Sequence, residues 1–349
     1  MRPILLNPGP VSLSDGVRQA AVHTDLCHRE PEYFNVQARV RQALLDVYDC
    51  DSALWTSVLL GGSGTTALEA MLASLLPRDA RLLVLENGVY GERISKIANI
   101  HGIDTQAIGH DWMEVIGFDE VERQLAGGEF THVAAVHHET TTGRLNDVNQ
   151  LAAICEKHGA GLFLDTVSSF GAESIPFNSK ALVACAATSN KCLHGIPGMC
   201  MVVARRSSID DAVEPPRSLY LYLPLWAGLQ DKNSTPFTPP VNSVLALDRA
   251  LTELRDAGGW SARHARYQKL IRRVDRALKR YGVELMLEQS EYSCVLHSYR
   301  IPSGMDYAGI HAGLKQRGFI IYAGQGSLAE EMFRISTMGD IGHYDMERL

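Results

Sequence analysis

The chain has 349 residues, which is long enough to bury a large core and to divide into two domains. Hydrophobic residues make up 46% and charged residues 21%, as in an ordinary globular protein, and the formal net charge of −7 excludes the strong basic field of nucleic-acid-binding proteins. No apolar run reaches the roughly 18 residues of a membrane helix. Prolines interrupt the N-terminus too early for a signal peptide. The seven cysteines include no CxxC pair, which indicates free thiols in a reducing cytoplasm.

Strand-like and helix-like segments alternate from about residue 50 to 205. Such alternation predicts crossover units and a largely parallel sheet with helices on both faces, an α/β fold. The expected strands are Ser57–Leu60, Arg81–Glu86, Asp104–Ile108, His132–His137, Leu162–Asp165, Leu182–Ala187 and Met199–Ala204. The expected helices are Thr65–Leu76, Gly91–His101, Asp119–Leu125 and Asn149–His158.

The later part of the chain has a different pattern. The segment Glu214–Pro240 is rich in proline, which predicts an extended loop without a long helix. Helices are expected over Asn242–Asp256 and Trp260–Tyr281, and the basic side chains of the second one predict a solvated face. A smaller α+β domain is expected from the elements that follow, namely strands Val283–Leu287 and Cys294–Arg300, helix Tyr307–Arg317, and strands Phe319–Tyr322 and Met332–Ser336.

Lys191 follows the apolar strand Leu182–Ala187 and precedes the glycine- and proline-rich loop Gly195–Gly198. A lysine at the mouth of a buried strand is costly to desolvate as a cation. Proteins accept that cost where the amine acts as a neutral nucleophile, for example in a Schiff base. Taken alone, Lys191 is typical of an ordinary surface lysine, and two upstream features change that interpretation.

The first of these features is Asp165, which ends the apolar strand Leu162–Asp165. Open α/β sheets bind ligands at the carboxyl ends of their strands. As an isolated residue, Asp165 is typical of a cap or a turn. Its functional interpretation is an anion that keeps a pyridinium nitrogen protonated, as enzymes of pyridoxal phosphate (PLP) require.

The second feature is the run Gly61–Thr66, between the strand Ser57–Leu60 and a helix. Glycines and small hydroxyls at a helix N-terminus form a nest for phosphate. The run is not a P-loop, because no Gly-Lys-Ser/Thr follows. One glycine-rich turn is weak evidence for phosphate, but the order of nest, strand-end Asp165 and strand-end Lys191 carries more weight than any single feature.

With these motifs, the sequence resembles the class V aminotransferases, a family of fold-type-I PLP enzymes. Within that family it is most similar to the branch that transfers the amine of 2-aminoethylphosphonate to pyruvate. The matching stretches cover essentially the whole chain and are Leu5–Pro10, Thr56–Thr65, Asn87–Arg93, His138–Gly143, Asp165–Gly171, Ser189–Cys192 and Phe333–Ile335.

The resemblance implies a fold and an assembly. A large PLP-binding domain is expected over residues 1–245, with an N-terminal segment that reaches the small domain and the active site. A small α+β domain is expected over residues 246–349. The family also implies a homodimer with its active site at the subunit interface, and products phosphonoacetaldehyde and L-alanine in phosphonate degradation.

The resemblance implies roles for the residues around the cofactor ring. Lys191 would bind PLP covalently and then move a proton between the substrate carbon and the cofactor. Asp165 would keep the ring nitrogen protonated. Tyr90 would stack on the ring, Val167 would pack on its other face, and Thr140 would contact the ring oxygen. Tyr90 and Val167 also fit plain packing roles.

Other residues would hold the phosphate or the substrate. Ser63, Gly64, Thr65 and Asn190 match phosphate-binding positions of the family. Thr238 matches a threonine that reaches the cofactor phosphate of the neighbouring subunit. Arg334 matches the arginine that clamps the carboxylate or phosphonate of the substrate through two hydrogen bonds, although an isolated strand arginine is typically structural.

The chain departs from the family in three places. The stretch Gln230–Thr235 replaces a segment that contains Trp and His in the phosphonate branch. The segment Cys27–Glu30 matches only some members, so His28 and Arg29 fit either a solvated loop or a contact with the distal anion. Members of the family also continue for another helix past the equivalent of Leu349.

Three alternative functions remain at this level. The same cofactor site suits an aminotransferase for serine or alanine with pyruvate or glyoxylate. A cysteine desulfurase shares the fold but needs a mobile nucleophilic cysteine, and the only cysteine after Cys200 is Cys294, in a strand-like stretch. A non-catalytic scaffold would be free to lose Lys191 and Asp165, which this chain keeps.

Overall fold

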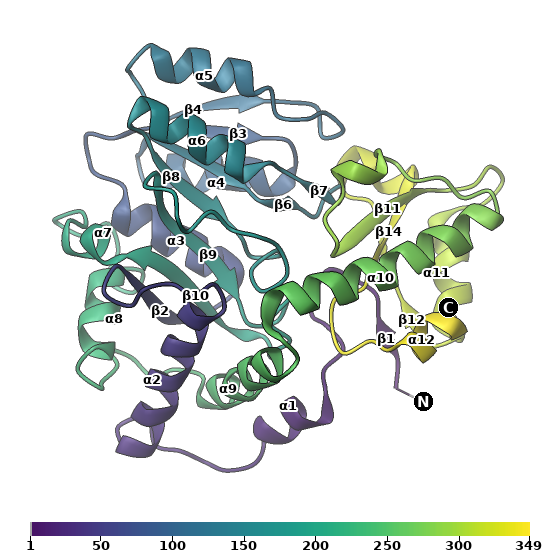
Figure 1. Cartoon of the computed structure of the whole chain (residues 1–349), viewed down its shortest axis with the longest axis horizontal. Helices are drawn as coiled ribbons and strands as arrows, with labels where there is room; N and C mark the ends of the chain where they lie inside the picture. The colour runs from purple at the N-terminus through teal and green to yellow at the C-terminus, as the bar shows by residue number, and fades with distance from the viewer. Residues whose placement is uncertain (1) are drawn as a thin grey trace.

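A seven-stranded sheet forms the centre of the larger lobe in the computed structural model, which describes residues 2–349 (Figure 1). Its order is β2-β10-β9-β8-β5-β3-β4, and within these residues only β10 runs against the other strands. The strands are β2 (Trp55–Gly62), β3 (Arg81–Glu86), β4 (Asp104–Gly109), β5 (His132–Val136), β8 (Gly161–Asp165), β9 (Leu182–Thr188) and β10 (Gly198–Arg205). The turn between β9 and β10 is too short for a crossover, so these two strands pair antiparallel.

Two layers of helices cover the faces of this sheet (Figure 1). One face carries α2 (Pro31–Asp46), α5 (Phe118–Ala126), α6 (Val148–His158) and α9 (Val241–Asp256). The other carries α3 (Gly64–Leu75), α4 (Val89–Ile100), α7 (Arg206–Asp210) and α8 (Leu223–Gln230). Strand β3 shows how the sequence makes both faces apolar, because Leu83 and Leu85 enter the first layer while Leu82 and Val84 enter the second.

The α/β fold predicted from the alternating pattern is confirmed. Every strand and helix expected between residues 50 and 205 is present, with ends that differ by at most two residues. The prediction of an extended loop over Glu214–Pro240 is wrong in one part, because the short helix α8 forms within it and has Pro224 in its first turn. Proline is compatible with that position, since its missing N–H would have no intrahelical partner there.

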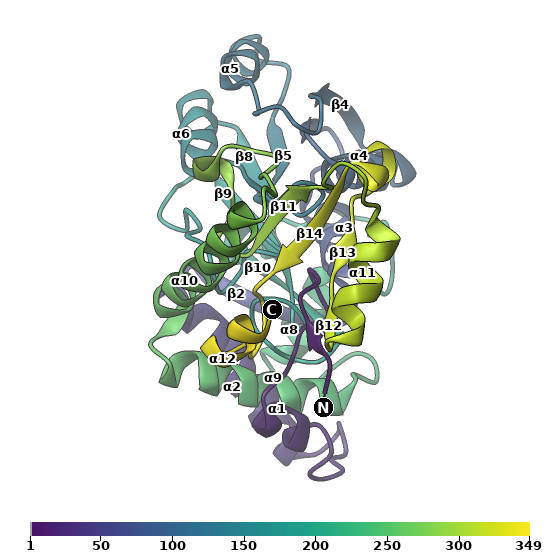
Figure 2. The ribbon, with the colours of Figure 1, turned by 90° about the vertical axis from the view of Figure 1, so that its right-hand side faces the viewer.

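A small antiparallel sheet, β11-β14-β13, forms the core of the second lobe (Figure 2). Its strands are β11 (Leu296–Arg300), β13 (Tyr322–Ala323) and β14 (Met332–Ser336). The lobe also contains α10 (Gly259–Arg280), α11 (Tyr307–Gln316), α12 (His343–Arg348) and two short 3-10 turns, η1 (Gln289–Glu291) and η2 (Gly326–Glu330). Leu270, Ile271 and Val274 on α10 pack with β11 and β14 side chains, whereas Arg272 and Arg276 on the same helix are exposed.

Two strand predictions in this lobe are wrong. The segment Val283–Leu287 makes a single bridge, between Leu285 and Tyr299, and the hydroxyl of Tyr292 takes the N–H of Leu287 that a ladder would need. The expected strand Phe319–Tyr322 is two short strands in different sheets, β12 (Phe319–Ile320) and β13. The helix α12 was not predicted.

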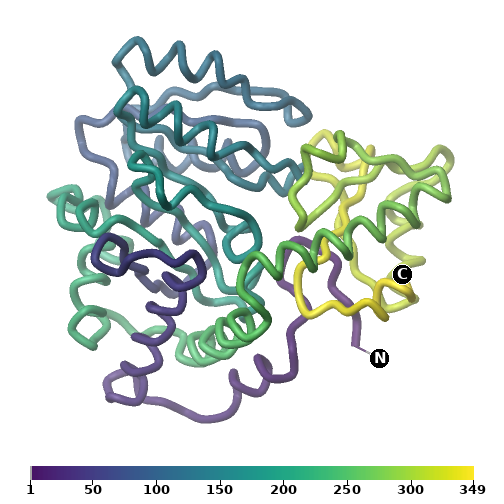
Figure 3. Tube along the Cα trace, viewed as in Figure 1, coloured from purple at the N-terminus to yellow at the C-terminus, as the bar shows by residue number. Residues whose placement is uncertain are grey.

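The N-terminal segment links the two lobes. Strand β1 (Ile4–Leu5) pairs in parallel with β12, and the backbone of Leu6 accepts a hydrogen bond from Ser336 in β14 (2.7 Å). Both chain ends therefore lie on the small lobe, close to each other (Figure 3). From there the chain passes to α1 (Asp15–Ala20) and α2 on the large lobe. In residues 2–349, no helix combines the length and apolar character needed to cross a membrane.

Candidate active site

Asp165 and Lys191 lie at the carboxyl edge of the central sheet. Asp165 is the last residue of β8 and pairs in register with Ala186 of the neighbouring parallel strand β9, while Lys191 lies in the turn directly after β9. Two adjacent strand ends therefore bring both side chains to the edge where open α/β sheets bind ligands. A Cβ at Gly9 would lie 3.3 Å from Lys191 Cε, so the N-terminal segment runs against the lysine side chain.

The Asp165 carboxylate is buried, with 5% of the residue exposed. Its Oδ1 accepts a hydrogen bond from the backbone N–H of Val167 (2.9 Å). Burial raises the pKa of Asp165, while that hydrogen bond and the positive charges of Lys191 and Arg93 oppose the rise. A buried anion at this edge of the sheet is suited to stabilise a protonated ring nitrogen.

The glycine turn after β2 leads into α3 as expected. Ser63 is the N-cap residue of α3, and its N–H donates to Thr66 Oγ1 (3.2 Å). A Cβ at Gly64 would lie 2.6 Å from Val167 Cγ1, which leaves no space for a side chain there. The helix therefore begins directly beside the Asp165–Val167 turn, with its first N–H groups free of intrahelical partners.

Arg93 is a site residue that the sequence analysis did not identify. Its Nη1 donates to Thr65 Oγ1 (3.3 Å), and its guanidinium carbon lies 4.6 Å from the centre of the Tyr90 ring. Lys191 Nζ lies 5.8 Å from the same ring centre. Residues three apart on a helix share one face, so the run Asn87–Arg93, which ends in this arginine, carried a signal that could have identified it.

Arg334 lies on β14 and is buried, with 3% of the residue exposed. Its hydrogen bonds go to neutral oxygens, the carbonyls of Thr140 (2.7 Å) and Ala323 (2.9 Å) and the side-chain oxygen of Gln325 (3.1 Å). Burial lowers the pKa of Arg334, and Glu139 and nearby tyrosines oppose the change. Because its hydrogen bonds all go to neutral oxygens, the buried guanidinium has no ion-pair partner within residues 2–349 and is suited to bind an anionic ligand.

Three of the residues expected to hold the cofactor phosphate make no contact with Asp165, Lys191 or Arg334 among the hydrogen bonds described above. Ser63 and Thr238 are exposed, and the Asn190 side chain accepts a hydrogen bond from Thr188 Oγ1 (2.8 Å). Thr238 lies two residues before Pro240, and a Cβ at Gly61 would lie 3.2 Å from Pro240 Cδ. The Thr238 segment thus runs beside the glycine turn of its own chain.

The two segments that depart from the family contact each other. Arg29 donates to the carbonyl oxygen of Thr235 (2.7 Å). At the other end of the stretch, the Gln230 side chain is buried and bonds to both the N–H (3.1 Å) and the carbonyl (2.7 Å) of Leu59 in the edge strand β2. The stretch Gln230–Thr235 is therefore connected to the segment Cys27–Glu30 through the hydrogen bond between Arg29 and Thr235.

The site residues fit the PLP that the resemblance implies. Thr140 Oγ1 is buried and, within residues 2–349, has no hydrogen-bond partner, as expected of a hydroxyl whose partner is a ligand. Helix α3 begins with Gly64 and Thr65, whose N–H groups have no intrahelical partner and suit a phosphate. Lys191 and Asp165 add the amine and the anion at the same edge of the sheet.

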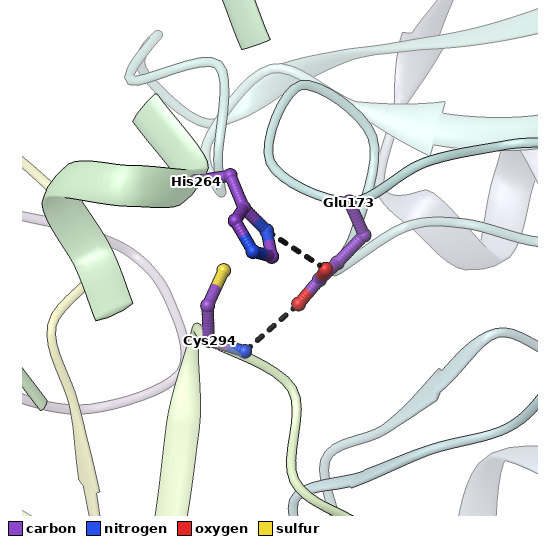
Figure 4. A group of neighbouring side chains, drawn as sticks. All are labelled: Glu173, His264 and Cys294. Atoms are coloured by element: carbon purple, nitrogen blue, oxygen red, sulfur yellow. Dashed lines mark hydrogen bonds and ion pairs between the residues drawn. The ribbon is translucent and has the colours of Figure 1, made fainter. Parts of the chain in front are cut away.

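A second polar cluster lies between the lobes and has a structural explanation (Figure 4). Figure 4 shows His264 from α10 and Cys294 from the segment before β11 converging on Glu173. One carboxylate oxygen accepts from Ser293 Oγ (2.6 Å) and the N–H of Cys294 (2.8 Å), and the other lies 3.1 Å from His264 Nδ1. The ligand atoms of Glu173, His264 and Cys294 are within 4.8 Å of one another, but the carboxylate already contacts three protein groups, in Ser293, Cys294 and His264. The cluster therefore fastens the small lobe to the large one.

The same cluster argues against a cysteine desulfurase. Cys294 is buried, with 4% exposed, and burial raises the pKa of its thiol well above the usual value. Its Sγ donates to the carbonyl of Ala172 (3.8 Å). A neutral, buried thiol between two lobes lacks the mobility and the thiolate character of a catalytic nucleophile.

Comparison with known proteins agrees with this geometry. A family model described as "Aminotransferase class-V" matches residues 18–341. The chain belongs to the class-V aminotransferase family. The matched range includes Asp165, Lys191 and the glycine turn at the start of α3.

Individual relatives match over nearly the full length. The chain is 34% identical to a 2-aminoethylphosphonate–pyruvate transaminase of Bacteroides fragilis, with 100% of this chain and 98% of the relative covered. It is 35% identical to a protein of the same name from Vibrio cholerae, over 99% of this chain and 95% of the relative. Among solved structures, the alanine–glyoxylate aminotransferase of Nostoc sp. is 25% identical and has a TM-score of 0.91, with 100% of this chain and 93% of the other covered.

Proposed function

We propose that this aminotransferase moves the amine of 2-aminoethylphosphonate to pyruvate, using PLP, and releases phosphonoacetaldehyde and L-alanine. The observation that carries the proposal is Arg334, a buried guanidinium that is held by neutral oxygens beside the Thr140 hydroxyl. Both substrates are anionic at the end remote from the transferred amine. One arginine can therefore bind phosphonate and carboxylate in turn.

The names of the full-length relatives support the same substrates. Identities of 34% and 35% across 95% or more of each chain extend over both lobes, including the region of Arg334. The cofactor assignment is supported by the class-V family and by the buried Thr140 hydroxyl. The role of each site residue is part of this proposal.

PLP, when bound, withdraws electrons from the amine-bearing carbon of the substrate so that this carbon can lose a proton. Lys191 would hold the cofactor, and its freed Nζ would then take that proton and return it. Asp165 would keep the ring nitrogen protonated. Tyr90 and Val167 would orient the ring, and Gly64, Thr65 and the start of α3 would hold the phosphate, together with Ser63 and Asn190.

The active assembly in this proposal is a homodimer. Thr238 is exposed in the single chain. In the family resemblance, the equivalent threonine reaches the cofactor of the neighbouring subunit. A dimer would therefore bring Thr238 of the partner subunit to the Gly64–Thr65 phosphate site.

Absorbance measurements on the yellow, PLP-loaded protein test the proposal. We expect 2-aminoethylphosphonate to remove the visible band quickly, and pyruvate to restore it with formation of alanine. Serine and phosphoserine in separate cuvettes should act slowly. The absence of bound PLP after incubation with the cofactor would overturn the cofactor assignment, and conversion by alanine or serine alone would overturn the substrate assignment.

A second candidate function is amine transfer from alanine or serine to pyruvate or glyoxylate. The observation in its favour is the TM-score of 0.91 to an alanine–glyoxylate aminotransferase, together with the departure of Gln230–Thr235 from the phosphonate branch. Conversion by alanine or serine, without conversion by 2-aminoethylphosphonate, would favour this function.

A further inference from the structure

Glu139 is a fully buried carboxylate in the short strand β6 (His138–Glu139) that the roles above do not use. Its Oε1 accepts from the N–H (3.0 Å) and the hydroxyl (2.7 Å) of Thr141. Its Oε2 accepts from the backbone N–H groups of Tyr90 (3.2 Å) and Gly91 (3.4 Å). All four contacts are donated to the carboxylate, so these hydrogen bonds favour its ionised form.

The chain makes space for this carboxylate at the start of α4. A Cβ at Gly88 would lie 2.3 Å from Glu139 Cδ, so only glycine fits there. The first turn of a helix leaves N–H groups without intrahelical partners, and a negative charge at that end is stabilising. Glu139 therefore fixes the first turn of α4, and with it the ring of Tyr90 that lies 5.8 Å from Lys191 Nζ.

The same carboxylate fixes the turn that follows β6. Besides its two contacts with Glu139, Thr141 accepts a hydrogen bond from the N–H of Val89 in α4 (3.1 Å). The preceding residue, Thr140, bears the unpartnered hydroxyl, and its carbonyl accepts from Arg334 (2.7 Å). The buried Glu139 side chain thus connects Tyr90, which is expected to stack on the cofactor ring, to Arg334, which is expected to bind the substrate anion.

The charged groups around Glu139 come from several elements. Burial raises the pKa of Glu139 to about 7, and the negative charge of Asp165 at the end of β8 contributes to the rise. Arg334 on β14 presents a positive charge to it, and Tyr90 on α4 also faces that arginine. His138 is adjacent in the chain, but burial lowers its pKa to about 3, so it stays neutral near pH 7.

We propose that Glu139 is a positioning residue that sets the affinity for the amine donor, because it holds Tyr90 and the Thr140 carbonyl, and through that carbonyl Arg334, in one arrangement. This inference rests on the proposed role of Arg334 as the substrate clamp. Glu139 would act through its neighbours, without contact to cofactor or substrate.

A double-mutant cycle between Glu139→Gln and Arg334→Ala tests this inference. A glutamine offers one acceptor oxygen and places an NH₂ against donors, so we expect the KM for 2-aminoethylphosphonate to rise about tenfold, the equivalent of roughly one hydrogen-bonding contact. In the Arg334→Ala background the same change should alter KM less than twofold. Equal effects in both backgrounds, or an unchanged KM in the single variant, would overturn the proposal. Glu330→Gln, at an exposed position on η2, is the matched control.

A second pair of variants keeps the test informative where Glu139→Gln does not fold. Thr141→Val removes the 2.7 Å hydroxyl contact, and Thr141→Ser restores it. We expect Thr141→Val to raise the KM and Thr141→Ser to return it to the wild-type value. A rise in both variants would assign Thr141 to packing alone and contradict the inference.

The pH dependence supplies a readout that a merely structural role would not change. As the pH falls through about 7, Glu139 takes up a proton and loses acceptor capacity, so the KM should rise in the wild type. This rise in KM at low pH should be absent in Glu139→Gln, and its persistence in that variant would overturn the proposal. If the wild type accepts alanine in place of 2-aminoethylphosphonate, the same cycle is measured with alanine, which separates failure of this inference from failure of the proposed substrate.

Discussion

Arg334 Nη1 donates a hydrogen bond of 2.7 Å to the carbonyl oxygen of Thr140, a residue 194 positions earlier in the chain. The bond joins β14 of the small lobe to the turn after β6 in the large lobe. An anion bound by this arginine would therefore lie close to the unpartnered Thr140 hydroxyl. The candidate site is formed jointly by both lobes.

Removal of the Arg334 guanidinium should weaken substrate binding and leave the cofactor bound. For Arg334→Ala we expect a loss of about 2–5 kcal/mol of affinity for anionic donor and acceptor, as for one truncated partner of a buried charge pair. The measurement is the KM for each substrate together with the visible absorbance of the bound cofactor. Unchanged affinity for both anions would assign the clamp to another residue. Arg334→Lys should rescue little, because an ammonium cannot make the two-pronged contact.

Replacement of Lys191 should abolish turnover without unfolding the protein. The Lys191 side chain lies along Gly9 at the edge of the sheet, outside the two main apolar cores, so Lys191→Ala removes little packing. We expect no measurable transamination, with a molar mass by light scattering that is the same as that of the wild type. Normal activity in this variant would end the assignment of Lys191 as the covalent cofactor ligand.

A methyl group at Gly64 should weaken cofactor binding. The added Cβ would lie 2.6 Å from Val167 Cγ1, and relief of such overpacking costs about 1–3 kcal/mol. We expect Gly64→Ala to raise the dissociation constant for PLP about tenfold or more, measured by absorbance titration of the apoprotein. Gly228→Ala is the control, because a Cβ there meets no atom within 4 Å on helix α8, and it should stabilise the protein by about 0.5–1 kcal/mol. Equal PLP affinity in both variants would contradict the prediction.

The Glu173 cluster between the lobes should make stability depend on pH. Burial would raise the pKa of Glu173, but hydrogen bonds from His264 and Ser293 outweigh it and lower the pKa to about 2. The stability that ionised Glu173 contributes is fully present above pH 4.5, the ordinary pKa of a glutamate, and is lost as the pH falls towards 2. The pKa of His264 is raised, so its contribution is present below about 6.5 and is lost at higher pH.

Glu173→Gln should therefore destabilise the protein most between pH 4.5 and 6.5, by about 3 kcal/mol for a shift of this size. The difference from the wild type should narrow as the pH falls below 4.5. Denaturant unfolding across a pH series measures it. A difference that stays constant with pH would show that Glu173 acts by packing and not by its charge.

The parts of the site that follow from strand position were predictable from the sequence. Asp165 and Lys191 each end an apolar run, and parallel strands bring such ends to one edge. The run Gly61–Thr66 was equally visible, because glycine and small hydroxyls opened a periodic helix. Each of these signals lies within a short stretch of sequence, so it can be recognised without knowing which distant segments it contacts.

The remaining features depend on contacts between distant segments. The role of Glu139 follows only from the approach of β6 to the start of α4. The length of β12 was wrong because its partner is β1, more than 300 residues away, and no local pattern contains that pairing. Helix α2 was not predicted although Pro31 in its first turn is a recognised start signal.

The pairing of β1 with β12 also determines when the active site can form during synthesis. Residues 4 and 5 leave the ribosome more than 300 residues before their strand partners, residues 319 and 320. The Gly9 segment that lies against Lys191 is anchored by this pairing and the nearby contact with β14, and by Val11, which packs with Cys192 and Tyr267. The large lobe can begin to fold as it emerges, but this anchor of the wall beside the lysine forms only after residues 319 and 320 have been synthesised. A nascent chain released early would thus carry the lysine and the aspartate without a closed site around them.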